Sequence, residues 1–220
     1  MAKLTRTRVA DRIFLVRFAT QYALASTFLR FQEHHESRRF SGRVFSLEQF
    51  MDWYASEFGD FTYYQDWSGF NIPSTALAPF YEGRFDPLLD KEQRLLDLFE
   101  DTSGDYYVIA MTESSSRADL VHELAHALFF TDATYRKRVQ AVLRAHDTTR
   151  LRESLYRAGY ARRVLTDEAH GYALTGAGGM LPRAEARALV PLQRELRAIF
   201  KAHGAALVAR MSSTSSARSR

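Results

Sequence analysis

The stretch of sequence that decides the fold is Tyr106 to Phe130, YYVIAMTESSSRADLVHELAHALFF. Its first part, Tyr106 to Thr112, is an almost continuous apolar run with the length and composition of a buried β-strand. A short polar turn of glutamate and serine follows. Ser116 and Asp119 then have the spacing of a capping box, which predicts the start of a helix. The stretch therefore predicts a buried strand followed directly by a helix that ends near Phe130.

The middle of this helix carries the pattern H-E-x-x-H, as His122–His126, HELAH. Residues four apart lie on one face of a helix, so both imidazoles can reach the same metal ion. Glu123 is one position further round, where it can take a proton from a metal-bound water. The alternative is a helix with two surface histidines and a glutamate. The apolar neighbours of the motif argue against this alternative, because unpaired polar groups are costly to bury.

A metal bound by this motif needs a further ligand, since a catalytic zinc usually has three protein ligands and a water. The chain contains no cysteine, which excludes sulfur ligands, disulfides and a thiol nucleophile. The third ligand must then be a histidine or a carboxylate. The downstream candidates are Asp132, His146, Glu153, Asp167, Glu168 and His170.

The segment Thr166–Tyr172, TDEAHGY, gathers two carboxylates, a histidine and a tyrosine beside a glycine-rich turn. If it is helical, Glu168 and Tyr172 share a face at spacing i, i+4, so one can bind the metal while the other faces a substrate. The longer side chain of Glu168 favours it over Asp167 as the ligand. Asp167 is then expected to accept the free ring N–H of one of the histidines. Asp132 is better placed to cap the next helix.

HELAH followed by Asp167-Glu168 resembles the gluzincin branch of zinc metallopeptidases, in which a glutamate on a later helix is the third ligand. The resemblance covers Tyr106 to Tyr172. The first hundred residues, including FTYYQDWSGFN from Phe61 to Asn71, resemble an uncharacterised bacterial and viral group with the same paired motifs. The chain lacks the N-E-x-x-S-D pattern of the best-known peptidases and the extended metzincin signature. The resemblance implies zinc ligands at His122, His126 and Glu168, with Glu123 as general base.

This chemistry predicts a zinc-dependent metallopeptidase that holds one zinc ion per chain and acts on a peptide or protein. Zinc lowers the pKa of its bound water towards ~7, and Glu123 carries the proton to the departing amine. An oxyanion donor is also needed. Tyr172 is the first choice, followed by Tyr160 and His170. The alternative function is a zinc-binding regulatory or interaction protein without peptidase activity, associated with nucleic acid.

The rest of the chain predicts a helix-rich α+β domain, zincin-like, with a small sheet of two to four strands packed beside the H-E-x-x-H helix. We expect a single domain over residues 1–211, with an N-terminal part of about 1–100 and a metal-site part of 101–211. Residues 212–220 form a basic tail expected to be disordered. Ile13–Phe18 is a further expected strand, and Phe61–Ser74 is expected to be irregular. Helices are expected from Thr20, over 46–59, after Asp86-Pro87, over 116–130, from 132, over 149–160 and 167–174, and up to about 204 with a bend at Pro191.

The composition is that of an ordinary globular protein, with 46% hydrophobic and 25% charged residues. The net charge of +4 comes largely from the two ends and does not by itself indicate a nucleic-acid partner. The apolar stretch Ile13 to Leu29 is broken by Arg17, Gln21 and Thr27, which makes it too polar to span a bilayer or to serve as a secretory signal. We therefore expect a cytoplasmic protein without a membrane partner.

Overall fold

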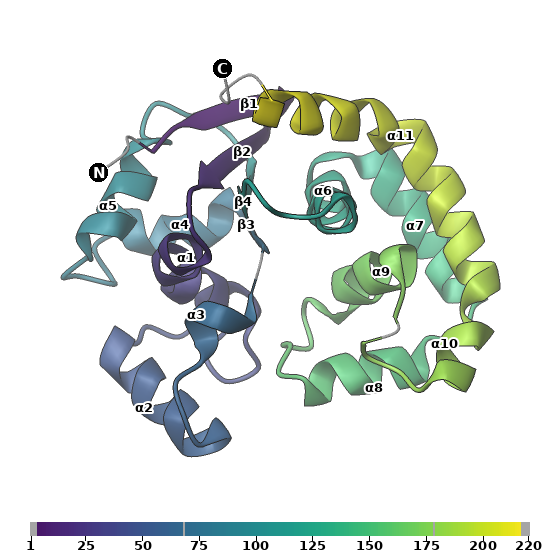
Figure 1. Cartoon of the computed structure of the whole chain (residues 1–220), viewed down its shortest axis with the longest axis horizontal. Coiled ribbons are helices and arrows are strands. Elements are labelled where there is room, and N and C mark those ends of the chain that lie inside the picture. Colours follow the sequence, from purple (N-terminus) through teal and green to yellow (C-terminus); the bar gives the residue numbers. More distant parts are fainter. Residues whose placement is uncertain (1–3, 68, 178, 217–220) are drawn as a thin grey trace. The chain divides into compact units, whose positions relative to one another are not determined.

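The computed structural model describes residues 4–67, 69–177 and 179–216. The described residues are largely helical and include a four-stranded mixed sheet, which confirms the expected α+β class (Figure 1). The chain divides into two compact units, residues 1–115 and 116–220. All four strands belong to the first unit, and the elements in the described part of the second unit are helices. No helix in the described ranges has the length and apolar character needed to cross a membrane.

The sheet of the first unit has the strand order β1-β2-β4-β3. The antiparallel hairpin of β1 and β2 pairs with β4 through β2, which runs parallel to β4, and β3 is antiparallel to β4 on its other side. Every residue of β4 is buried, as expected of a strand flanked on both sides. The two expected strands are confirmed as β2 and β4. The strands are β1 (Arg6–Ala10), β2 (Ile13–Phe18), β3 (Gly69–Pro73) and β4 (Tyr107–Thr112).

Strand β3 corrects the expectation that Phe61–Ser74 is irregular. The stretch contains a one-turn helix and then a strand that pairs from Gly69↔Met111 to Pro73↔Tyr107. A proline is tolerated there because β3 is an edge strand and Pro73 lies at its end. The pairing partner is distant in the sequence, so local pattern alone does not reveal the strand.

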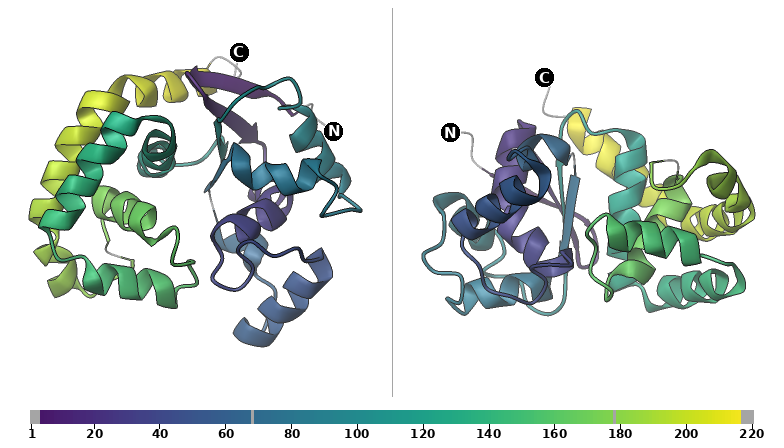
Figure 2. Two further views of the ribbon diagram at one scale, coloured as in Figure 1. Left: turned by 180° about the vertical axis from the view of Figure 1, so that it is seen from behind. Right: turned by 90° about the horizontal axis from the view of Figure 1, so that it is seen from below.

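Two helices of the first unit begin where capping residues predict. Thr20 accepts a hydrogen bond from the Ala23 amide at 3.1 Å, and Ser46 and Gln49 form a reciprocal capping box. Gly59, with φ of 89°, ends the second helix in the left-handed conformation. Helix α1 packs against β2, β4 and β3 (Figures 1 and 2). The helices are α1 (Gln21–Glu36), α2 (Leu47–Phe58), α3 (Tyr63–Asp66), α4 (Ser74–Tyr81) and α5 (Asp90–Asp97).

Helix α5 begins at Asp90, so the expected start at Asp86-Pro87 is wrong. The Glu92 carboxylate accepts a hydrogen bond from the Leu89 amide at 2.8 Å, which caps the helix from inside its first turn. The same carboxylate pairs with Arg30 of α1, and the two side chains are 1% and 6% exposed. The start of α5 is therefore set by a buried ion pair with a distant helix, which the local sequence does not display.

We predict that Glu92→Ala lowers the free energy of unfolding of the first unit by about 3–5 kcal/mol, because it leaves the buried Arg30 charge unpaired. Adding Arg30→Met should restore most of the loss. Chemical denaturation followed by tryptophan fluorescence measures this, since both tryptophans, Trp53 and Trp67, belong to the first unit. Asp11→Ala is the control, because the exposed Arg8–Asp11 pair should contribute less than about 1 kcal/mol. Equal effects of Glu92→Ala and Asp11→Ala would contradict the prediction.

In the second unit the long helix α11 packs along α6, α7 and α9 (Figure 2). Asp132 caps α7 as expected, accepting from the Thr134 and Tyr135 amides at 2.9 and 3.0 Å. The capping box of Ser116 and Asp119 is also present. The helices are α6 (Arg117–Thr131), α7 (Ala133–Ala145), α8 (Thr149–Arg157), α9 (Leu165–Thr175), α10 (Arg183–Ala188) and α11 (Val190–Ser216).

The C-terminal expectations need three corrections. Helix α10 has no counterpart among the expected helices. Pro191 causes no bend inside a helix, because α11 begins at Val190 and the proline lies in the first turn, where its missing N–H is harmless. Helix α11 also continues to Ser216, past the expected end near Gly204 and into the expected disordered tail. The remainder of that tail, 217–220, lies outside the described residues.

Candidate metal centre

The two histidines of the motif lie on one face of α6. The capping box fixes the start of this helix, with the Asp119 amide 3.1 Å from Ser116 Oγ and the Ser116 amide 2.9 Å from Asp119 Oδ2. His126 is 1% exposed, and the Nε2 atoms of His122 and His126 are 3.1 Å apart. The expected i, i+4 convergence of the two imidazoles is therefore present.

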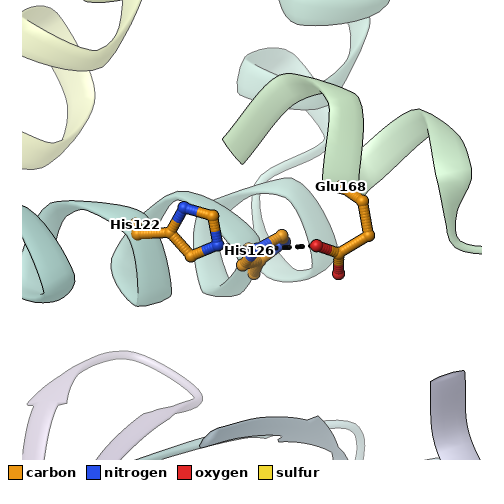
Figure 3. A group of neighbouring side chains, drawn as sticks. All are labelled: His122, His126 and Glu168. Carbon is orange, nitrogen blue, oxygen red and sulfur yellow. Dashed lines mark hydrogen bonds and ion pairs between the residues drawn. The ribbon is translucent and has the colours of Figure 1, made fainter. Parts of the chain in front are cut away.

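Glu168 on α9 completes a group of three side chains that could hold a metal ion (Figure 3). One ligand atom from each of His122, His126 and Glu168 lies within 4.8 Å of the others. Glu168 Oε2 is 3.9 Å from His126 Nε2. In a tetrahedral zinc site with bonds of about 2.0–2.1 Å, neighbouring ligand atoms are about 3.3 Å apart. The separation of the two Nε2 atoms, 3.1 Å, is near this value and that of Glu168 from His126 is longer, so the three groups could hold a metal ion.

Thr175, on the last turn of α9, orients His122. Its hydroxyl donates to the Gly171 carbonyl at 2.9 Å and lies 3.3 Å from His122 Nδ1. Because the single hydroxyl proton is used on the carbonyl, Thr175 can only accept from Nδ1–H. The lone pair of His122 is then on Nε2, facing His126. No sequence motif pointed to Thr175, although it is one helical turn from Gly171.

Asp167 lies behind His126, on the side away from His122. Its Oδ1 atom is 3.0 Å from His126 Nδ1, although the ring N–H is not well aligned with this oxygen. Burial opposes ionisation of Asp167, but His126 and His170 outweigh it and hold the carboxyl pKa at about 2. This negative charge favours a proton on Nδ1 and so a lone pair on Nε2. Asp167 therefore lies beside the Nδ1 atom of His126, and its role in supporting a metal ligand stays a prediction.

Gly171 lets α9 approach the two histidines closely. A Cβ atom at this position would lie 2.9 Å from His126 Nε2 and 3.0 Å from His122 Cε1. The first distance is shorter than real Cβ contacts and the second is tighter than nearly all of them, so any larger residue would require the imidazoles to shift. The sequence drew attention to the glycine-rich turn that follows α9, not to this glycine inside it.

The electrostatics of the group favour a bound cation. Burial lowers the pKa of His122 to about 3, and the neighbouring histidines contribute. Burial raises the pKa of Glu168 to about 8; His126 opposes this shift, whereas Asp167 and Glu123 add to it. Burial also works against a charged His126, but the same three carboxylates outweigh it and raise the pKa of His126 well above its usual value. The carboxylates around His126 therefore favour positive charge at this point, which a divalent cation could supply.

The expected general base and oxyanion donor flank this group. Glu123 is 7% exposed and acts electrostatically on both His126 and Glu168. The Tyr172 ring contacts the edge of His122, with 5.0 Å between ring centres. Its hydroxyl is 3.0 Å from that of Tyr160, so the two tyrosines form a pair beside the histidines.

The other candidate ligands have different partners. Asp132 caps α7 and lies 2.8 Å from His203 Nδ1. His146 is 2.9 Å from Glu195 on α11, and Glu153 pairs with the exposed Arg150. His170 points its Nε2 at the Tyr135 hydroxyl, 2.8 Å away. The structure thus groups Glu168, not these residues, with the two motif histidines.

Comparison with known proteins adds no family to this geometry. No protein-family model, no curated protein and no solved structure matches the chain.

We predict that Glu168→Ala loses metal under mild chelation, whereas Asp167→Ala retains part of its affinity. Loss of a group that only contacts a ligand typically costs about 10–100-fold in affinity, less than loss of the ligand itself. Competition with a chromophoric zinc chelator measures both variants. The reverse order would make Asp167 the ligand, and full retention by both would exclude this site.

We also predict that Gly171→Ala weakens zinc binding by more than about tenfold, because the new methyl group displaces the imidazoles from each other. Gly179→Ala is the matched control, since no atom lies within 4 Å of a Cβ added there. Zinc titration with circular dichroism as a check of folding distinguishes the two variants. Equal zinc affinities of the folded Gly171→Ala and Gly179→Ala proteins would contradict the prediction.

Proposed function

We propose that the chain is a zinc-dependent hydrolase, a gluzincin-like metallopeptidase with His122, His126 and Glu168 as its zinc ligands. The observation that carries the proposal is the convergence of the two Nε2 atoms, which lie 3.1 Å apart beside Glu168. Thr175 and Asp167 each occupy the Nδ1 side of one histidine, so both Nε2 atoms are left for a common partner. A purely structural role for a buried and a partly buried histidine does not require this convergence.

Glu123 supports hydrolysis over a purely structural metal site. Structural zinc sites use four protein ligands, whereas catalytic sites use three and leave a position for water. Among the described residues, the group of potential ligands has three members. A buried carboxylate next to His122 in the sequence adds nothing to metal binding at such a site, but a general base in a hydrolase needs such a carboxylate.

A zinc ion bound here would supply an activated water and polarise the substrate carbonyl. The Glu123 carboxylate accepts the proton of that water and returns it to the nitrogen of the departing amine. Tyr172 donates its hydroxyl proton in a hydrogen bond to the developing oxyanion, with Tyr160 as the group that orients the hydroxyl. Thr175 and Asp167 keep the two imidazoles in the tautomer that leaves Nε2 free.

We predict that Glu123→Gln keeps one zinc per chain and the native fold but loses hydrolysis by about a thousandfold or more, because an amide cannot accept the proton. Metal analysis of the purified proteins measures their zinc content. An unbiased peptide library measures hydrolysis, and it should be cleaved by the wild type and not by the variant. Glu153→Gln is the control, since Glu153 lies in an exposed pair on α8. Zinc-loaded wild type that cleaves no peptide would instead support a regulatory zinc protein, and Glu123→Gln with full activity would refute the general-base role.

A further inference from the structure

Two buried polar residues lie beyond Asp167 and have no role in the proposed mechanism. Tyr135 is in the first turn of α7 and His170 is on α9, and both are 0% exposed. The Tyr135 hydroxyl is 2.8 Å from His170 Nε2. His170 Nδ1 is 3.5 Å from Asp167 Oδ1, the same oxygen that lies 3.0 Å from His126 Nδ1. A continuous row of polar atoms therefore connects Tyr135 to a proposed metal ligand.

Only one direction of hydrogen bonding along this row avoids repulsion between neighbouring groups. A neutral imidazole carries one N–H and one lone pair. If Nδ1 of His170 held the lone pair, that lone pair would face the Asp167 carboxylate at 3.5 Å, which is repulsive. The favoured arrangement places the proton on Nδ1, facing Asp167, and the lone pair on Nε2, where it accepts from the Tyr135 hydroxyl. The ring of Phe129 stacks on His170 at 25° with 5.5 Å between centres, which fixes the ring plane.

We propose that Tyr135 and His170 are positioning residues of the metal site, which hold the Asp167 carboxylate against His126 and so fix the ring of that ligand. The inference rests on the proposed metal site. It means that α7, which contributes none of the three proposed ligands, nevertheless controls the geometry of one of them. The tyrosine proton is the part of the row that a single conservative substitution can remove.

The test is a double-mutant cycle on the full chain with zinc affinity as the readout. Tyr135→Phe removes one hydroxyl and keeps the buried ring. It should weaken zinc binding by about three- to tenfold, less than the roughly 10–100-fold typical of a group in direct contact with a ligand. In an Asp167→Asn background the same substitution should have almost no further effect, because the carboxylate through which it acts is gone. Tyr156→Phe, on α8, is the matched control and should leave zinc affinity unchanged.

A second readout needs no metal. In ¹⁵N-labelled protein, the nitrogen chemical shifts of His170 should show a proton on Nδ1 and a hydrogen-bonded lone pair on Nε2 in the wild type. In Tyr135→Phe the proton should stay on Nδ1, facing Asp167, the Nε2 shift should move to that of a lone pair without a hydrogen bond, and the Nδ1 shift of His126 should change with the position of the carboxylate. A merely structural role for Tyr135 would lower thermal stability without changing the His126 shift.

The outcomes separate the inference from the function on which it rests. Wild type that takes up no zinc would overturn the metal site and the proposed function together. Wild type that binds zinc, with unchanged affinity in Tyr135→Phe, would overturn the positioning role alone. A Tyr135→Phe effect that persists in full in the Asp167→Asn background would also overturn that role alone, because the tyrosine then does not act through the carboxylate.

Discussion

Two imidazole nitrogens whose lone pairs face each other at 3.1 Å repel one another unless a proton or a cation lies between them. The packing of α6 against α9 holds the Nε2 atoms of His122 and His126 at this distance. Thr175 lies within hydrogen-bond distance of His122 Nδ1, and the Asp167 carboxylate lies 3.0 Å from His126 Nδ1. Glu168 then adds negative charge at the same point. The centre is thus a place where positive charge is required, and the contacts around it supply none of that charge.

Such a centre is stable only if the two helices cannot move apart. Helix α11 packs against both α6 and α9. It also satisfies the end of α9, because Arg197 and Gln193 both donate to the Leu174 carbonyl, at 3.2 and 3.4 Å. At the other end, His203 of α11 bonds Asp132, the residue at which α6 stops and α7 starts. Polar contacts of α11 with the ends of α6 and α9 therefore help to hold the second unit together around His122, His126 and Glu168.

The sequence predicted those parts of the structure that depend on local chemistry. Capping residues located the starts of α2, α6 and α7, and the H-E-x-x-H spacing located the facing histidines. It failed where the cause is a distant contact. Strand β3 exists through its pairing with β4, and the start of α5 depends on an ion pair with Arg30. Thr175 and Gly171 were missed for a related reason: their roles appear only when α9 is placed on α6, not in their own surroundings along the chain.

The residues that α9 contributes to the site form a short sequence pattern. Asp167, Glu168, Gly171 and Thr175 all serve the two histidines, at positions i, i+1, i+4 and i+8 of one helix. They amount to a pattern D-E-x-x-G-x-x-x-T downstream of H-E-x-x-H. A single-residue insertion in α9 would rotate half of these groups away from α6. The composite pattern is therefore far more selective than H-E-x-x-H alone, and it offers a signature by which chains with the same centre could be recognised in genomes without any overall likeness.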